Sequence, residues 1–162
     1  EATDRKAEIN GFPIYARSIM DIATRSGPTT GYTELGSYSI KGQVVRVISR
    51  VHDGSIWWLQ IEFEYKEKIV RCYTGLKRVD VDISRVPDEP KTPVGSGVLT
   101  MDVAAYYGPG EQYKEMPAKM TPEAGTSGTV LFEENGWVCL EYPDPNGKLT
   151  ARVWVPAYAV QY

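Results

Sequence analysis

The sequence has few side chains for catalysis or metal binding. It contains one histidine, His52, and two cysteines, Cys72 and Cys139, among 162 residues. Nucleophilic catalysis needs a nucleophile, a base and a group that orients the base. A structural zinc site needs four Cys or His ligands, and two cysteines cannot form a disulfide framework. We therefore expect a non-catalytic protein without metal or cofactor.

Long hydrophobic runs and an excess of positive charge are also missing. No run approaches the 18 apolar residues that predict a membrane-spanning helix. The net charge is −3 at pH 7, whereas proteins that bind nucleic acid usually carry a basic face. The GSG at 95–97 lacks the lysine of a phosphate-binding loop. We expect neither a transmembrane segment nor a nucleic-acid partner.

No segment shows the i, i+3, i+4, i+7 pattern of an amphipathic helix. The sequence has 15 glycines and 11 prolines, which punctuate short runs rich in β-branched and aromatic residues. These runs include QVVRVISRV, WWLQIEF, GTVLF and WVCLEY. The pattern predicts an all-β protein of short strands.

An internal repeat organises these strands. MDIATRSGPTTGY at 20–32 recurs as MDVAAYYGPGEQY at 101–113, offset by 81. Later matches are WLQIEF (58–63) with WVCLEY (137–142), offset by 79, and RCYTGLKRV (71–79) with RVWVPAYAV (152–160), again offset by 81. The offset changes near two turn signals, Asp53-Gly54 and Asn135-Gly136, where insertions cost little. The chain therefore contains two copies of one unit.

The repeat predicts two domains, at residues 12–86 and 94–162. A segment with three prolines lies between them, and we interpret residues 87–93 as a short, stiff linker. Residues 1–11 are interpreted as an N-terminal extension.

The order of features in each copy resembles the bacterial SH3-like (SH3b) family. ATRSGPTTGY is similar to the family's R-S-G-P-S segment, NGWVCLEY to its N-G-W-x-x-V strand, and RVWVPAYAV to its closing G-W-V segment. The resemblance covers nearly all of both halves and implies two tandem small SH3-like barrels. The copies depart from the family where its arginine is Arg25 in copy one but Tyr106 in copy two, and where its closing Gly-Trp is Cys72-Tyr73 and Val153-Trp154.

Alternation along the strands predicts which side chains form the cores. In WVCLEY (137–142), Val138 and Leu140 point to the opposite face from Trp137, and WLQIEF (58–63) alternates in the same way. We expect the aliphatic side chains in the cores and the tryptophans at the rim. Acidic residues such as Glu62 and Glu134 are interpreted as solvated surface.

Aromatic residues occupy corresponding places in the two copies and suggest a peptide-binding groove on each. The candidate ligand-binding residues are Arg25, Tyr32, Trp57, Trp58, Tyr73, Tyr106, Tyr107, Tyr113, Trp137 and Tyr158. Alternatively, the rings fill small cores or an interface between domains, because small domains need large apolar side chains to close.

The resemblance implies a non-catalytic tandem module that recognises cell-wall peptides or a protein partner. It also implies an extracytoplasmic location, secreted or envelope-associated, with a signal peptide removed before the first residue. Two copies raise avidity if both engage one polymer. The alternatives are a structural or assembly protein of the envelope with buried aromatic faces, the targeting part of a cell-wall hydrolase, and a hydrolase that uses Cys72 or Cys139. No oligomeric state is predicted.

Overall fold

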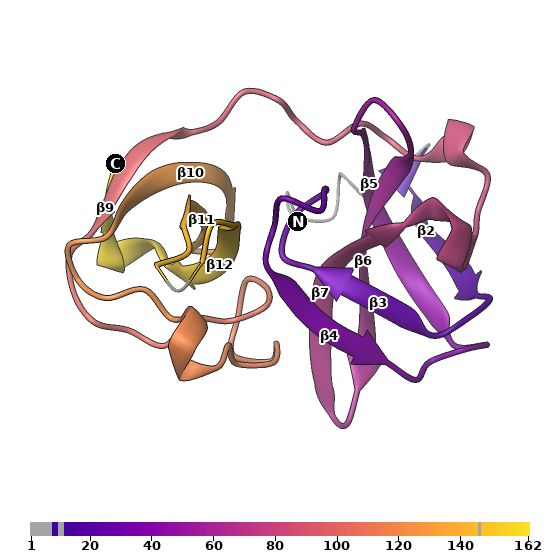
Figure 1. Cartoon of the computed structure of the whole chain (residues 1–162), viewed down its shortest axis with the longest axis horizontal. Coiled ribbons are helices and arrows are strands. Elements are labelled where there is room, and N and C mark those ends of the chain that lie inside the picture. The colour runs from indigo at the N-terminus through magenta and orange to yellow at the C-terminus, as the bar shows by residue number, and fades with distance from the viewer. Residues whose placement is uncertain (1–7, 10–11, 146) are drawn as a thin grey trace. The chain divides into compact units, whose positions relative to one another are not determined.

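The computed structural model describes residues 8–9, 12–145 and 147–162. Most of the predicted N-terminal extension therefore lies outside the described residues. The chain divides into two compact units, one of Glu1–Glu64 with Arg71–Glu89 and one of Tyr65–Val70 with Pro90–Tyr162. Two curled antiparallel sheets, consistent with two small barrel-like domains, confirm the predicted all-β fold class (Figure 1).

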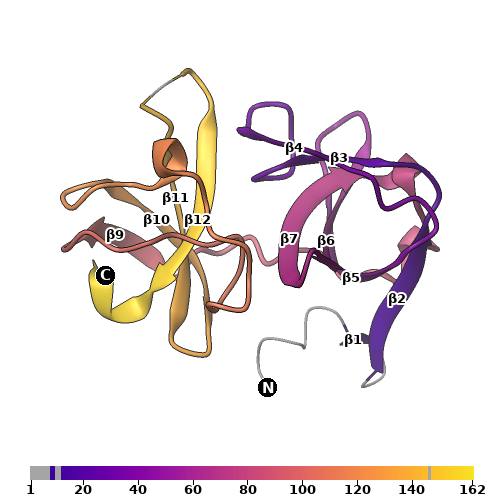
Figure 2. The same cartoon turned by 90° about the horizontal axis from the view of Figure 1, so that it is seen from below.

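The first sheet has the strand order β1-β2-β5-β6-β7-β3-β4, and β8 pairs with β2. Its strands are β1 (Glu8–Ile9), β2 (Phe12–Ser18), β3 (Ile22–Arg25), β4 (Glu34–Tyr38), β5 (Val44–His52), β6 (Trp57–Tyr65), β7 (Lys68–Gly75) and β8 (Val79–Asp80). Figure 2 shows β5, β6 and β7 as neighbouring, strongly bent strands. Two three-residue 3₁₀ helices follow β7, η2 (Leu76–Arg78) and η3 (Ile83–Arg85).

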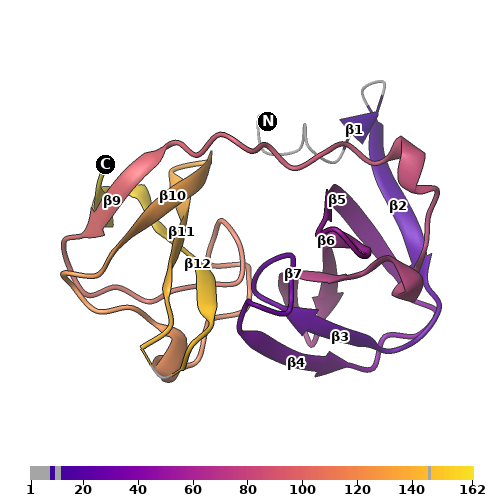
Figure 3. The same cartoon turned by 45° about the horizontal axis from the view of Figure 1, so that its top comes forward.

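The second sheet has the order β12-β11-β10-β9-β13. Its strands are β9 (Gly95–Leu99), β10 (Ser127–Glu134), β11 (Trp137–Pro143), β12 (Thr150–Pro156) and β13 (Val160–Gln161). Figure 3 shows β10, β11 and β12 side by side. The 3₁₀ helices are η4 (Ala118–Met120) and η5 (Ala157–Ala159). None of the helical segments in the described part of the chain has the length and hydrophobicity needed to cross a membrane.

Aliphatic side chains form the cores, as the alternation predicts. The largest side chains that are fully buried are Ile22, Ile48, Leu59, Ile61, Leu99, Leu140, Val45, Val47, Val70, Val130, Val138 and Val153. The other face of the second sheet is covered as well. There the rings of Phe132 and Trp154 stack at 6.3 Å and Cys139 is buried beside them. Both faces of β11 are therefore packed.

The same backbone hydrogen bonds occur within each of the two copies, at equivalent positions. Ser26 N–H donates to Thr33 O at 2.9 Å, and at the equivalent positions of the second copy Tyr107 N–H donates to Lys114 O at 2.8 Å. Other matched pairs are Tyr32 N–H to Thr29 O with Tyr113 N–H to Gly110 O, and Ile19 N–H to Arg78 O with Thr100 N–H to Ala159 O. The repeat seen in the sequence is therefore a repeat of backbone conformation.

The Gly-Pro loop of each copy is closed by a tyrosine ring. A Cβ on Gly27 would lie 2.2 Å from Cδ2 of Tyr32, and a Cβ on Gly108 would lie 2.2 Å from Cδ2 of Tyr113. Real Cβ atoms do not come this close to a ring carbon, because the overlap is strongly repulsive. The spacing between glycine and tyrosine therefore records a direct contact in both copies.

An ion pair on adjacent strands also occurs in both units. Arg71 Nε lies 2.9 Å from Glu62 Oε1, and Arg152 Nε lies 2.8 Å from Glu141 Oε1. A second arginine, Arg46, reaches the other oxygen of Glu62 at 3.1 Å. The interpretation of Glu62 as solvated surface is wrong, because its side chain is 11% exposed. The interpretation of Glu134 as solvated surface is wrong as well, because Glu134 is buried.

Residues 87–89, interpreted from the sequence as linker, pair with β5. Arg50 N–H donates to Pro87 O at 2.9 Å, and Glu89 N–H donates to Arg50 O at 3.0 Å. The buried Glu89 carboxylate accepts a hydrogen bond from Tyr73 Oη. The first unit therefore continues to Glu89.

Candidate functional site

A cavity of about 450 Å³ lies in the first unit. Its walls come from β3 and β4, from the start of β6, and from η2 just after β7. The lining side chains that carry charge or large apolar surface are Arg25, Glu34, Ile56, Trp58, Lys77 and Arg78. Two residues predicted from the sequence, Arg25 and Trp58, thus share one cavity.

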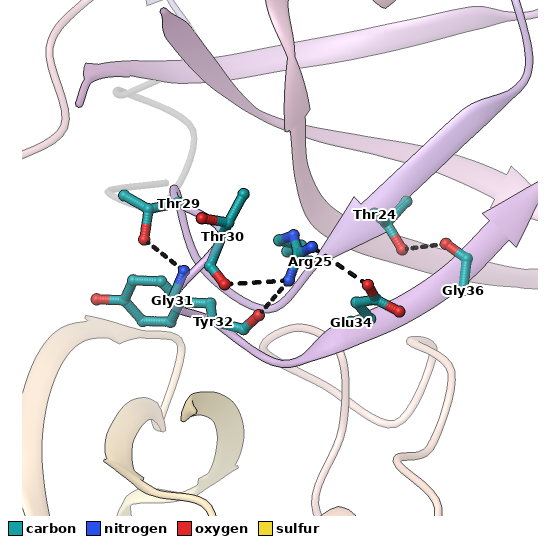
Figure 4. Close-up of polar contacts among 8 residues, drawn as sticks. All are labelled: Thr24, Arg25, Thr29, Thr30, Gly31, Tyr32, Glu34 and Gly36. Carbon is teal, nitrogen blue, oxygen red and sulfur yellow. Dashed lines mark hydrogen bonds and ion pairs between the residues drawn. The ribbon is translucent and has the colours of Figure 1, made fainter. Parts of the chain in front are cut away.

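Arg25 is held in place by the loop that follows it. It ends β3, where its backbone pairs with Tyr73. Its Nη1 donates to Tyr32 O at 2.8 Å and to Thr30 O at 3.3 Å, and its Nη2 lies 3.2 Å from Glu34 Oε2 (Figure 4). The Arg25 side chain is 21% exposed and that of Glu34 is 73% exposed. The carbonyl groups therefore fix a guanidinium that solvent still reaches.

The β3–β4 hairpin has side-chain bonds that keep this geometry. Thr24 Oγ1 donates to Gly36 O at 2.9 Å, beside the register shift that follows Thr24 (Figure 4). Gly36 has φ +91°, which disfavours other residues. Within the loop, Gly31 N–H donates to Thr29 Oγ1 at 3.0 Å. These bonds fix the wall that carries Arg25.

Trp58 is positioned by Asp53 in the β5–β6 turn. The Trp58 indole N–H donates to Asp53 Oδ2 at 2.9 Å, while Oδ1 accepts the backbone N–H groups of Ser55 and Ile56 at 2.8 and 2.9 Å. These bonds, that from Ile56 foremost, lower the pKa of Asp53 to about 2. The ionised carboxylate therefore orients the ring at the cavity wall throughout the neutral range.

Trp57 faces a different group of side chains. Its ring lies 4.6 Å from the Arg50 guanidinium and 4.9 Å from the His52 ring. Arg50 also pairs with Asp88 at 2.8 Å. Trp57 is not among the residues that line the cavity. It packs on Arg50, which in turn holds residues 87–89 beside β5.

The cavity carries more positive than negative charge. Arg25, Lys77 and Arg78 line it, against one carboxylate, Glu34. The guanidinium of Arg78 donates to Asp21 O at 3.1 Å. Because these cations converge on one concave surface, it favours an anionic group such as a carboxylate.

The remaining predicted residues differ in burial, and only some of them offer surface to a ligand. Tyr73, Tyr107 and Tyr113 are at most 5% exposed. Tyr106 and Trp137 are half-buried, with their rings perpendicular at 5.4 Å. Tyr32 packs on Gly27, and Tyr158 is 73% exposed. The prediction of an exposed rim holds only in part, because Trp58 is 7% exposed even though it lines the cavity.

Sequence reasoning missed Glu34, Ile56, Lys77 and Arg78. Lys77 and Arg78 lie in η2, a three-residue helix too short to show a periodic pattern. Their signal in the sequence is the repeat itself, since RCYTGLKRV aligns with RVWVPAYAV. A comparison of charges between the aligned copies would have drawn attention to them.

A second cavity, of about 610 Å³, lies in the second unit and has no predicted site residue in its lining. It is bounded by residues 118–119 and 121–126, by Tyr142 and Pro143 of β11, and by Pro145. Tyr142 Oη donates to Met120 O at 2.8 Å. Burial raises the pKa of this phenol to about 12, with a smaller effect from Asp144. Tyr142 therefore ties the loop to the strand as a neutral hydrogen-bond donor.

Both cysteines are buried, and neither is part of a disulfide in the described structure. Burial, assisted by the nearby Glu62 carboxylate, raises the pKa of Cys72 far above that of an exposed thiol. Among the described residues, no three His, Cys, Asp or Glu side chains gather as a possible metal-binding group.

Comparison with known proteins does not extend this description. No family model, no curated protein and no solved structure matches the chain. The likeness to SH3b domains therefore rests on the sequence motifs.

Proposed function

We propose that the protein is a non-catalytic binding module whose first unit holds an extended peptide by a carboxylate in the Arg25 cavity. The single observation that carries this proposal is the Arg25 guanidinium, fixed by two loop carbonyls beside Lys77 and Arg78. A pre-oriented guanidinium binds a carboxylate through parallel N–H···O bonds. The exposed Ile56 and the edge of Trp58 offer apolar contact to the rest of the peptide.

Glu34 does not block this role. Its side chain is 73% exposed, and exposed ion pairs contribute about 0–1 kcal/mol. A ligand carboxylate can therefore displace Glu34 from Arg25 at small cost. A ligand without a negative charge does not displace Glu34, so Arg25 stays paired with Glu34 and does not bind such a ligand.

The ligand class follows from the SH3b resemblance. A cell-wall peptide, or a peptide segment of a protein partner, offers a carboxylate at its C-terminus or in its side chains. Small β-domains bind extended peptides along grooves of this kind. The extracytoplasmic location belongs to the same proposal, since cell-wall peptides lie there.

A second candidate is a structural or assembly protein of the envelope. The burial of Tyr73, Tyr107 and Tyr113 favours it, because these rings offer little free surface to a ligand. In such a protein the aromatic side chains stabilise the fold, and the Arg25 cavity has no ligand. The two candidates differ in whether Arg25 affects binding in the folded protein.

Chemistry at the cysteines has less support. A nucleophilic cysteine needs an accessible thiolate. Cys72 is 1% exposed with a raised pKa, and Cys139 is 2% exposed. Burial of both thiols supports the non-catalytic part of the proposal. The targeting part of a cell-wall hydrolase would use the same binding cavity.

The test is a pull-down with purified bacterial sacculi. The wild type is compared with Arg25→Gln and with Arg85→Gln, which removes an exposed arginine outside the cavity. We expect wild-type binding, a loss of about tenfold or more for Arg25→Gln, and no change for Arg85→Gln. Absence of wild-type binding would reject the cell-wall ligand and favour the scaffold. Equal losses in both variants would show general charge attraction. Amide spectra of each variant verify that it is folded.

A further inference from the structure

The repeat identifies a second surface, in the second unit, that corresponds to the Arg25 cavity. Arg25 pairs with Tyr73 in the first sheet, and Tyr106, the aligned residue of the second copy, forms a bridge with Trp154. Tyr73 and Trp154 are themselves aligned by the repeat. Tyr106 therefore has the structural position of Arg25.

The carboxylate opposite this position is also matched. Arg25 pairs with Glu34, and Tyr106 forms a bridge with Glu115. Between them, Thr30 corresponds to Glu111, inside a loop closed by matched hydrogen bonds in both copies. The other correspondences are Trp58 with Trp137, Lys77 with Tyr158, and Arg78 with Ala159.

These replacements reverse the charge of the surface. In the first unit the surface has three cations, Arg25, Lys77 and Arg78, and one carboxylate, Glu34, so its net charge is +2. At the same positions in the second unit, all three cations are gone and the carboxylates are Glu111 and Glu115, which gives −2. Tyrosines stand at two of the three positions that held cations.

The second surface carries aromatic rings where the first carries cations. The Tyr106 and Trp137 rings meet at 5.4 Å and 88°, and both are half-buried. Tyr158, in η5, is 73% exposed. Burial, and then the nearby carboxylates of Glu115 and Glu111, raise the pKa of Tyr106. Both negative charges therefore act on the Tyr106 side chain.

We propose that this surface of Tyr106, Trp137, Tyr158, Glu111 and Glu115 binds an ammonium group, such as the side chain of a lysine in a peptide. The faces of Tyr and Trp attract cations through their quadrupoles, and carboxylates add Coulombic attraction. Two lysines of the same unit lie nearby: Lys114 Nζ is 5.3 Å from the Tyr107 ring, and Lys68 Nζ donates to the backbone oxygen of Glu111. The two units thus take groups of opposite charge.

This second site rests on the proposed binding function, but a separate indole signal in each unit distinguishes failure of one site from failure of the other. The test uses nuclear magnetic resonance titration of the full chain with three small probes. They are N-acetyl-lysine amide, its neutral isostere N-acetyl-norleucine amide, and N-acetylglycine as the carboxylate. The Trp137 indole N–H reports the second unit and the Trp58 indole N–H reports the first.

We expect N-acetyl-lysine amide to shift the Trp137 signal and leave Trp58 unchanged, and the neutral isostere to shift neither. Glu115→Gln should weaken the lysine response by about tenfold, corresponding to about 1.4 kcal/mol. Tyr106→Phe should retain it, because the ring face is kept. Tyr106→Arg, which installs the residue of the first unit, should abolish it.

A Trp137 response of equal size to the lysine and norleucine probes would overturn the proposal, because the surface would then be merely apolar. No Trp137 response to the lysine probe would overturn it as well. The absence of a Trp58 response to N-acetylglycine would show separately that the Arg25 cavity does not bind a carboxylate. Tyr15→Ala, which removes a tyrosine that is 62% exposed on β2, is the matched control.

Discussion

Replacement of Gly27 by alanine should disturb the loop that holds Arg25. The added Cβ would lie 2.2 to 2.4 Å from three carbons of the Tyr32 ring. A ring that closes a loop cannot swing aside like the end of a lysine side chain, so the loop must shift. Tyr32 O accepts a hydrogen bond from Arg25, and the shift therefore reaches the proposed carboxylate site.

Overpacking of this kind costs about 1–3 kcal/mol. The first unit has the size of a small domain, for which each kcal/mol lowers Tm by about 4–8 °C. Gly31→Ala is the control in the same loop, because its nearest neighbour is only the Thr29 hydroxyl at 3.3 Å. We expect the control to change stability by less than about 0.5 kcal/mol.

A double-mutant cycle isolates the contact. Urea unfolding, followed through the Trp58 indole signal, gives the stability of the first unit for the wild type, Gly27→Ala, Tyr32→Ala and the double variant. Once Tyr32 is removed, the alanine at position 27 should cost almost nothing. Equal costs of Gly27→Ala with and without the ring would refute steric exclusion as the reason for this glycine.

Three other changes test local features. In the β6–β7 turn, Lys66 and Glu67 have φ of 52° and 69°, so replacing them with Asn-Gly should raise stability by about 1–2 kcal/mol in calorimetry. The folded-state pKa of Asp53 lies below its ordinary 3.8, so the stabilising effect of the ionised carboxylate is present above pH 3.8 and lost as the pH falls through about 2. The chemical shift of the Trp58 indole N–H should follow this titration, and Asp53→Asn should remove the pH dependence. The pKa of Tyr142 is raised to about 12 from 10.0, so stability should fall as the pH rises from 10 to 12, and Tyr142→Phe should flatten that slope in urea unfolding.

The sequence predicted the backbone better than the side-chain environment. The β-rich composition, the turn signals and the repeat each reflect local constraints. Asn135-Gly136 is an example, because both residues have positive φ in the β10–β11 turn. The spacing of Gly27 and Tyr32 is another, because their contact lies within one short loop.

The ion pairs could not be predicted because they depend on register. Arg71 and Glu62 lie on different strands, and a register shift occurs between β5 and β6 after Val47 and between β10 and β11 after Val130. Such a shift moves one residue relative to its partner, and alternation alone does not locate it. The aligned Arg and Glu positions were visible, whereas their pairing was not.

The burial of Trp58 shows where alternation fails. A period of two predicts one buried face when the other face is solvated. In β6 the four residues from Trp58 to Ile61 are all buried, because side chains cover both faces of the strand. Hydrophobic pattern therefore identified the strand but could not say which of its faces was free.

The two copies keep the contacts that involve the backbone and change the side chains that face the solvent. Gly27 and Gly108 each meet a tyrosine ring in the same way, and the loop hydrogen bonds recur at equivalent positions of the two copies. These contacts leave the side chains at the Arg25 and Tyr106 positions free to differ. A cation at one position and an aromatic ring at the other are what lead us to propose two different ligands for one fold, since a site is specified by its side chains rather than by its fold. The two copies of this chain therefore share a backbone and present surfaces of opposite charge at equivalent positions.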